Sequence, residues 1–197
     1  MIIEPGLFKI CHTGIEPNPG CLLISAPFLD QLYFKRSVIL LIDDMDNSVM
    51  GLIQNKPSRL FLNNIISGLE DIDRIPIFYG GPLQEDRLFY IHNLGDLIPN
   101  SIKISDNLYI DGDFNTVMSY LKSNQNIDGN IKFFLGYSGW SRNQLLNEIE
   151  DDTWLVSENN SNYILNQKGD EMWNEALSKL DSKFRQWLKY PKETYLN

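Results

Sequence analysis

The chain has 197 residues, of which 43% are hydrophobic and 22% are charged, a composition typical of one globular domain with a sizeable core. Its 26 acidic residues outnumber its 17 basic residues, and the formal net charge of -9 argues against direct binding to nucleic acid or anionic lipid. No apolar run approaches the ~20 residues that a membrane span needs, which argues against a membrane protein.

The N-terminal segment predicts both a local structure and a compartment. Residues 1–20 are rich in proline and glycine, which favours an extended lead-in rather than a helix. The segment 1–6 lacks the basic start and the unbroken apolar stretch of a signal peptide. We therefore expect a cytoplasmic protein.

Two cysteines, Cys11 and Cys21, lie ten positions apart without a C-x-x-C spacing. In a reducing compartment they are expected to be free thiols, so a thiol titration of the unreduced protein should count two. The alternative is a zinc site that adds His12 and His92. Such sites usually show two close ligand pairs, and this chain does not, so we predict no metal.

The first half of the sequence predicts strands over residues 22–24, 38–42 and 49–53. A predicted turn at residues 43–47 makes the last two an antiparallel pair. The second strand is apolar on both faces, which is typical of a central strand. Gly51 lies inside the third strand, where a glycine usually marks a bulge or a close backbone approach.

Apolar spacing then changes to that of a helix over residues 62–69. Strands are predicted at 75–79 and 88–91, on either side of a turn that starts with Gly80-Gly81-Pro82 and continues through polar residues. A weaker strand or hairpin is predicted over 102–110.

The second half alternates the two periods. Asp113 is expected to cap a helix over residues 114–121, and residues 131–135 form a buried strand. The string GYSGW, residues 136–140, is predicted to turn the chain into the next helix. A last strand at 153–156 precedes C-terminal helices within 170–190.

The helix after GYSGW has the clearest start signal in the chain. Ser141 fits the N-cap and Gln144 completes a capping box, while Trp140 and Leu145 occupy the positions of a hydrophobic staple. Carboxylates at the helix end offer ligands to a divalent cation, but such clusters are more often solvated surface acids. They are Glu148, Glu150, Asp151 and Asp152.

Hairpin strands interleaved with helices, without repeats or linkers, predict a single α+β domain over residues 1–197 with a mixed, mostly antiparallel sheet. Four strings also carry a family resemblance: residues 36–38, GLIQNKP at 51–57, GGPLQEDR at 80–87, and residues 134–156. In this order they resemble the bacterial YqgE/AlgH family.

The resemblance implies a compact α+β domain whose strongly curved, barrel-like sheet is flanked by helices. It implies no reaction, and transcriptional regulator, a label often given to the family, is not tied to a recognised DNA-binding motif. No catalytic residue can be transferred. Asn143 replaces the usual glycine after the GYSGW string.

GYSGW also invites comparison with the nucleophile elbow of serine hydrolases, in which Ser138 would attack. The spacing fails, because Trp140 stands where the second glycine should be and His92 precedes the serine. A less demanding hypothesis places an anion at the helix start beside Arg142. The capping box favours a purely structural role, since it already satisfies the helix donors.

The leading expectation is a noncatalytic protein that binds a protein or small ligand, with a regulatory role as the family label suggests. It would be a monomer or weak homodimer without a cofactor. The alternative is an enzyme or binder for a small anionic metabolite, in a polar cleft formed by Arg36, Asn55, Arg87 and His92 near predicted strand ends. Direct DNA binding ranks third.

Overall fold

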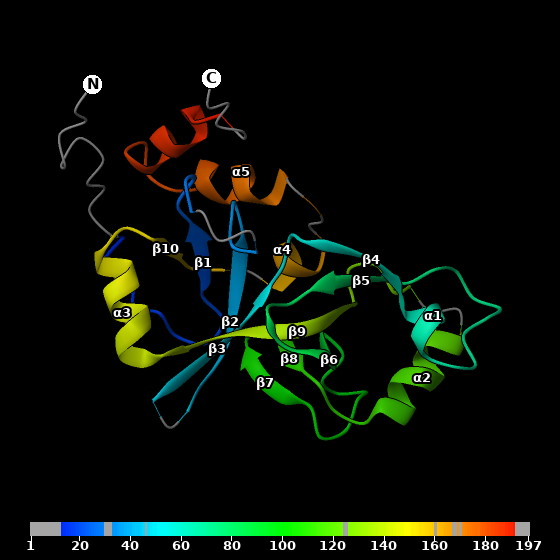
Figure 1. Cartoon of the computed structure of the whole chain (residues 1–197). Helices are drawn as coiled ribbons and strands as arrows, with labels where there is room; N and C mark the ends of the chain where they lie inside the picture. The colour runs from blue at the N-terminus through cyan, green and yellow to red at the C-terminus, as the bar shows by residue number, and fades with distance from the viewer. Residues whose placement is uncertain are drawn as a thin grey trace.

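The structure, a computed structural model, describes residues 13–29, 33–45, 47–123, 126–159, 161–166, 169 and 171–191 (Figure 1). The strands are β1 (Leu22–Ser25), β2 (Val38–Met45), β3 (Ser48–Ile53), β4 (Pro57–Phe61), β5 (Pro76–Tyr79), β6 (Leu83–His92), β7 (Ile102–Ser105), β8 (Leu108–Ile110), β9 (Ile131–Ser141) and β10 (Trp154–Ser157). The helices are α1 (Leu62–Ile65), α2 (Phe114–Lys122), α3 (Arg142–Glu150), α4 (Ser161–Asn166), α5 (Glu171–Ser178) and the 3-10 helix η1 (Phe184–Lys189).

The strands form one curled sheet with the order β10-β1-β2-β3-β9-β6-β8-β7, in which every neighbouring pair is antiparallel. β5 adds to β9 in the parallel sense and β4 pairs with β5. The sheet curls into a half-barrel, which confirms the predicted α+β class with a curved, mostly antiparallel sheet. No helix in the described part of the chain is both long and apolar enough to cross a membrane.

The apolar residues of β2 face opposite sides of the sheet, as its sequence predicted. On one side Leu40 packs in a core with Phe134 and with Trp173 of α5. On the other side Ile39 packs in a core with Leu145 of α3. A third core lies between β5, β6 and β9 and the helices α1 and α2. In Figure 1, α5 and α3 accordingly lie on different sides of the sheet.

β9 is a long strand whose two halves pair with different neighbouring strands (Figure 1). Its first half lies between β5 and β6, with Phe133 opposite both Ile77 and Tyr90. Its second half pairs with β3, where Ser138 lies opposite Gly51. The change of neighbour occurs around Gly136, whose φ of 68° is unfavourable for other residues.

The prediction that GYSGW forms a turn is therefore wrong, because the string continues β9 to Ser141. The polar residues of GGPLQEDR are likewise part of a strand, β6, which bulges between Leu83 and Leu88. Both strings contain glycines that allow backbones to meet, and the sequence alone did not separate this role from a turn. The prediction for Gly51 is confirmed, since β2 bulges between Leu41 and Asp43 opposite it.

Helix α1 is shorter than predicted and ends at Ile65. The amide of Asn63 instead organises the following loop, donating to the Leu69 carbonyl at 2.6 Å and accepting from the Ile75 N–H at 2.9 Å. The strand β4 and the six-residue helix α4 were not predicted, because segments this short show no clear period. The predicted C-terminal helices correspond to α5 and η1.

Candidate functional site

Arg36 and Asn55, two residues of the hypothesised polar cleft, lie together but serve the fold. The fully buried Asn55 amide accepts from the Val38 N–H at 3.0 Å and donates to the Arg36 carbonyl at 2.8 Å, so it ties the start of β2 to the end of β3. The Arg36 guanidinium lies 4.6 Å from the Trp173 ring centre and donates to the Tyr190 carbonyl. This arginine therefore ties the C-terminal helices to the sheet.

His92 is fully buried and held at both ring nitrogens. The Leu94 N–H donates to Nδ1 at 3.1 Å, so the proton lies on Nε2, which contacts the Asp111 carbonyl at 2.9 Å. Burial lowers the pKa of His92, which favours the neutral ring. Arg87 is exposed and lies 4.6 Å from the Phe89 ring centre.

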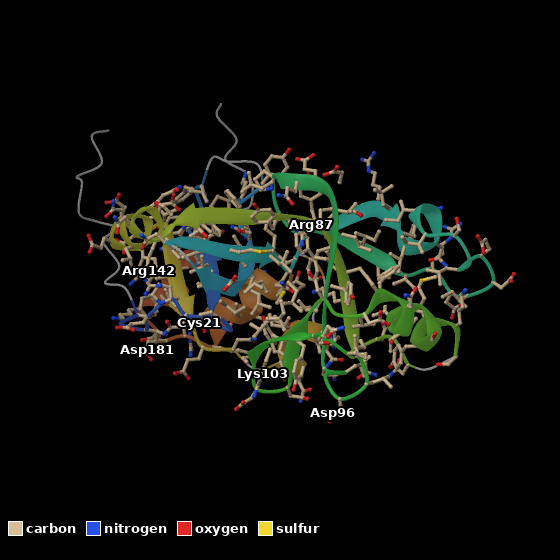
Figure 2. All side chains as sticks on the ribbon, turned by 90° about the horizontal axis from the view of Figure 1, so that it is seen from below. Cys21, Arg87, Asp96, Lys103, Arg142 and Asp181 are labelled. Carbon is tan, nitrogen blue, oxygen red and sulfur yellow. The ribbon has the colours of Figure 1, made fainter. Side chains whose placement is uncertain are left out.

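The remaining candidates lie on β9 and α3. Ser138 is fully buried and its hydroxyl is 3.3 Å from the Gly80 carbonyl, so it is not presented as a nucleophile. Arg142 begins α3, and its backbone N–H donates to the Asn47 carbonyl at 2.8 Å. Figure 2 shows Arg87 and Arg142 on separate parts of the molecule. The structure brings Arg36 to Asn55, and it places Arg87 and His92 on β6.

The start of α3 matches the prediction in part. Ser141 is the N-cap, and its hydroxyl accepts from the Gln144 N–H at 3.1 Å. The predicted capping box does not close, because the Gln144 side chain donates to Glu148 at 2.8 Å instead. Trp140 and Leu145 share one buried core, as a staple requires.

This different contact of Gln144 belongs to a cavity of about 360 Å³ between α3 and the β6–β9 pair, which we call the α3 cavity. Two of the strings that stand out in the sequence supply its walls, one through Pro82 and Leu83 and the other through Gly139 and Trp140. The other lining residues are Leu29, Phe34, Gln144, Glu148, Thr153 and Trp154.

The polar centre of the α3 cavity is the half-buried carboxylate of Glu148. Its Oε2 accepts from the indole N–H groups of Trp140, at 3.0 Å, and Trp154, at 2.7 Å. Its Oε1 accepts from the Gln144 amide at 2.8 Å. Three neutral donors thus fix the position of one carboxylate.

Aromatic rings form the apolar part of the wall. The indoles of Trp140 and Trp154 are perpendicular, with centres 5.9 Å apart, and Phe34 contacts both. Both indoles are nearly fully buried, which makes this side rigid. Leu83 is 42% exposed, so an apolar side chain remains in contact with solvent at the cavity.

Sequence reasoning placed Glu148 among surface acids and missed its role. The signals were the Gln144–Glu148 spacing on one helix face and the two tryptophans that flank the helix. Among the residues that the structure describes, no group of three His, Cys, Asp or Glu is arranged to hold a metal ion. Cys21 is a free thiol, and Cys11 lies outside the described residues.

The curled half-barrel sheet with a few helices defines the class of protein by its fold. Residues 22–185 match the sequence model of the family described as AlgH-like, and the chain belongs to this family. It is 44% identical to a UPF0301 protein of Parabacteroides distasonis over 97% of both chains. It is also 44% identical to one of Bacteroides fragilis over the full length of both.

Solved structures agree on the fold. A crystal structure of a Corynebacterium diphtheriae protein superposes with a TM-score of 0.73 at 20% identity, covering 89% of this chain and 94% of that one. The solution structure of the AlgH protein of Pseudomonas aeruginosa gives 0.67 at 22% identity, covering 91% and 100%. These two similarities describe the fold and not an activity.

Proposed function

We propose that this protein is a noncatalytic binding protein of the cytoplasm and that its α3 cavity takes up side chains of a partner protein. The main support is the position of Glu148, which accepts three hydrogen bonds at a cavity lined by residues of the GGPLQEDR and GYSGW strings. A rigid wall with few oriented polar groups is the usual character of a binding pocket.

The size and lining of the cavity favour side chains over a cofactor. About 360 Å³ is near the lower end of ligand pockets, which span roughly 300–1,000 Å³. The exposed Leu83 and the half-buried Pro82 extend the apolar lining towards solvent, where a partner surface would continue. A regulatory role, as the family label suggests, would act through this partner.

Two facts support a role without catalysis. Ser138 and His92 are buried in contacts that serve the fold. The polar side chains that line the α3 cavity include Glu148 and Thr153, and the carboxylate of Glu148 is held in place by three neutral donors. The alternative of an anionic metabolite at Arg36, Asn55, Arg87 and His92 has weaker support, because the first two serve the fold and His92 is buried.

Photo-cross-linking in the cells that make the protein tests this proposal. A benzoylphenylalanine at position 83 is expected to cross-link to a partner, whereas one at Ile102, which is 65% exposed on β7, is not. Gly139→Phe supplies the decisive comparison. A Cβ at Gly139 would point at Leu83, 2.9 Å from its Cδ1, so a large side chain there fills the cavity.

The cross-link at position 83 should disappear in the Gly139→Phe protein, while Ile102→Phe should leave it unchanged. Both variants must melt within a few degrees of the parent protein. A cross-link that persists with the cavity filled would overturn the proposed function.

A further inference from the structure

The charge of Glu148 has no cationic neighbour in the described chain. Its three hydrogen-bond partners are two indoles and an amide, all neutral. Lys103 and Asp106 form an ion pair elsewhere, on the β7–β8 hairpin. Among the described residues, the side chains that bind this carboxylate are therefore all uncharged.

The hydrogen-bond geometry also leaves capacity for a ligand. A carboxylate has about four acceptor positions, and three are occupied, two on Oε2 and one on Oε1. The remaining position is on Oε1, whose other donor is Gln144, an exposed residue of the cavity lining. Because both indoles bind Oε2, a donor to Oε1 does not compete with either tryptophan.

Other acidic residues close to Glu148 in the sequence add to its negative charge. Glu150, Asp151 and Asp152 follow on the same helix and its C-terminal turn, and the whole chain carries a net charge of -9. A field of this sign attracts cations and repels anions. The aromatic and aliphatic lining favours a cation that also has apolar surface, and a guanidinium group combines charge with a planar face that stacks on rings.

We infer that the α3 cavity binds an arginine side chain of a partner protein, with Glu148 accepting from the guanidinium and the Leu83 side of the cavity contacting apolar neighbours. This inference rests on the proposed function and specifies its ligand. The partner segment would therefore carry a basic residue between apolar ones.

Short peptides test the inference with a matched probe. Acetylated and amidated Ala-Leu-Arg-Leu-Ala is compared with the same peptide containing citrulline, the neutral isostere of arginine. Nitrogen-15 NMR resolves the indole signals of the four tryptophans, of which Trp140 and Trp154 line the cavity, whereas Trp173 and Trp187 belong to α5 and η1. The arginine peptide should shift the first pair and bind about tenfold more tightly than the citrulline peptide.

Two variants assign the effect to one carboxylate. Glu148→Gln keeps an acceptor for the indoles and should remove the preference for arginine over citrulline. Glu150→Gln removes the same charge from an exposed site on the same helix and should preserve it. Because the two peptides are also compared on the unaltered protein, the result does not depend on the folding of a variant.

The outcomes separate this inference from the proposed function. Equal binding of the arginine and citrulline peptides at the cavity would overturn the cationic ligand and leave the cavity as a binding site. Butylguanidinium binding as tightly as the arginine peptide would overturn a partner protein as the source. Peptides that leave the Trp140 and Trp154 signals unmoved would overturn the inference altogether.

Discussion

A Cβ atom built on Gly80 would lie 2.1 Å from the carbonyl oxygen of Gly136. The two glycines come from different strings of the sequence, and their backbones touch where β9 changes its neighbour from β5 to β3. Pro82, Leu83 and Gly139 all line the α3 cavity. The contact between the two glycines sets how the first two residues lie relative to the third. Substitutions at the glycines therefore test the architecture of the candidate site.

Gly80→Ala is expected to destabilise the protein by about 3 kcal/mol or more, because the obstructing atoms belong to backbone that cannot rotate away. Gly139→Ala is the matched control. Its Cβ would meet the movable end of the Leu83 side chain, so it should cost less than about 1 kcal/mol. Urea melts measure both, and equal losses would contradict the backbone contact.

The incomplete capping box gives a second prediction. Ser141→Ala should cost about 1 kcal/mol, because the hydroxyl is the acceptor for the Gln144 N–H. Gln144→Ala should cost only about 0.5 kcal/mol, the value of a helix-surface pair with Glu148. Denaturant melts of the single variants measure both losses of stability. A larger loss for Gln144→Ala than for Ser141→Ala would contradict the open capping box.

The staple can be tested in the same melts. Trp140→Ala should cost about 3 kcal/mol or more, since its indole is 5% exposed and packs with Trp154. If this loss were negligible, the start of α3 would not depend on the packing described above.

His92 gives the protein a predictable pH dependence. Its pKa is lowered by burial from the ordinary value of 6.5, so below that pH the unfolded chain binds more protons than the folded protein. The His92 contribution to stability is therefore lost as the pH falls below about 6.5. An NMR titration of the ring should give a pKa below this value, and a pKa above it would contradict the buried, neutral ring.

Direct DNA binding is tested separately. The formal charge of -9 predicts no sequence-specific binding at physiological salt, because phosphate contacts require clustered basic residues. A gel shift with submicromolar affinity for one operator, but not for a scrambled duplex, would contradict this expectation.

Local chemistry was readable from the sequence. The caps at Asp113 and Ser141 follow from side chains that bond a few residues away, and both are present, with Asp113 accepting from the Thr116 N–H at 2.8 Å. The apolar runs of β2 and β9 likewise predicted buried strands. Short-range patterns sufficed for the caps because their contacts are local, and for the strands because burial on both faces appears as a continuous apolar run.

The candidate site depends on contacts that sequence patterns do not encode. The residues next to Gly136 lie against a distant backbone, since a Cβ built on Gly81 would be 2.2 Å from the carbonyl carbon of Tyr137. The orientation of Glu148 is decided by two tryptophans that lie before and after α3. The roles of Asn55 and His92 depend in the same way on distant backbone, since Asn55 bonds the start of β2 and His92 contacts the Asp111 carbonyl.

The indole spectrum of the protein, recorded against a fragment library with and without Gly139→Phe, tests the central claim most directly. Binding fragments should shift the Trp140 and Trp154 signals together and leave Trp173 and Trp187 in place, and filling the cavity should abolish these shifts. Fragments that move the α5 and η1 tryptophans instead, or that bind equally well with position 139 filled, would contradict the α3 cavity as the binding site.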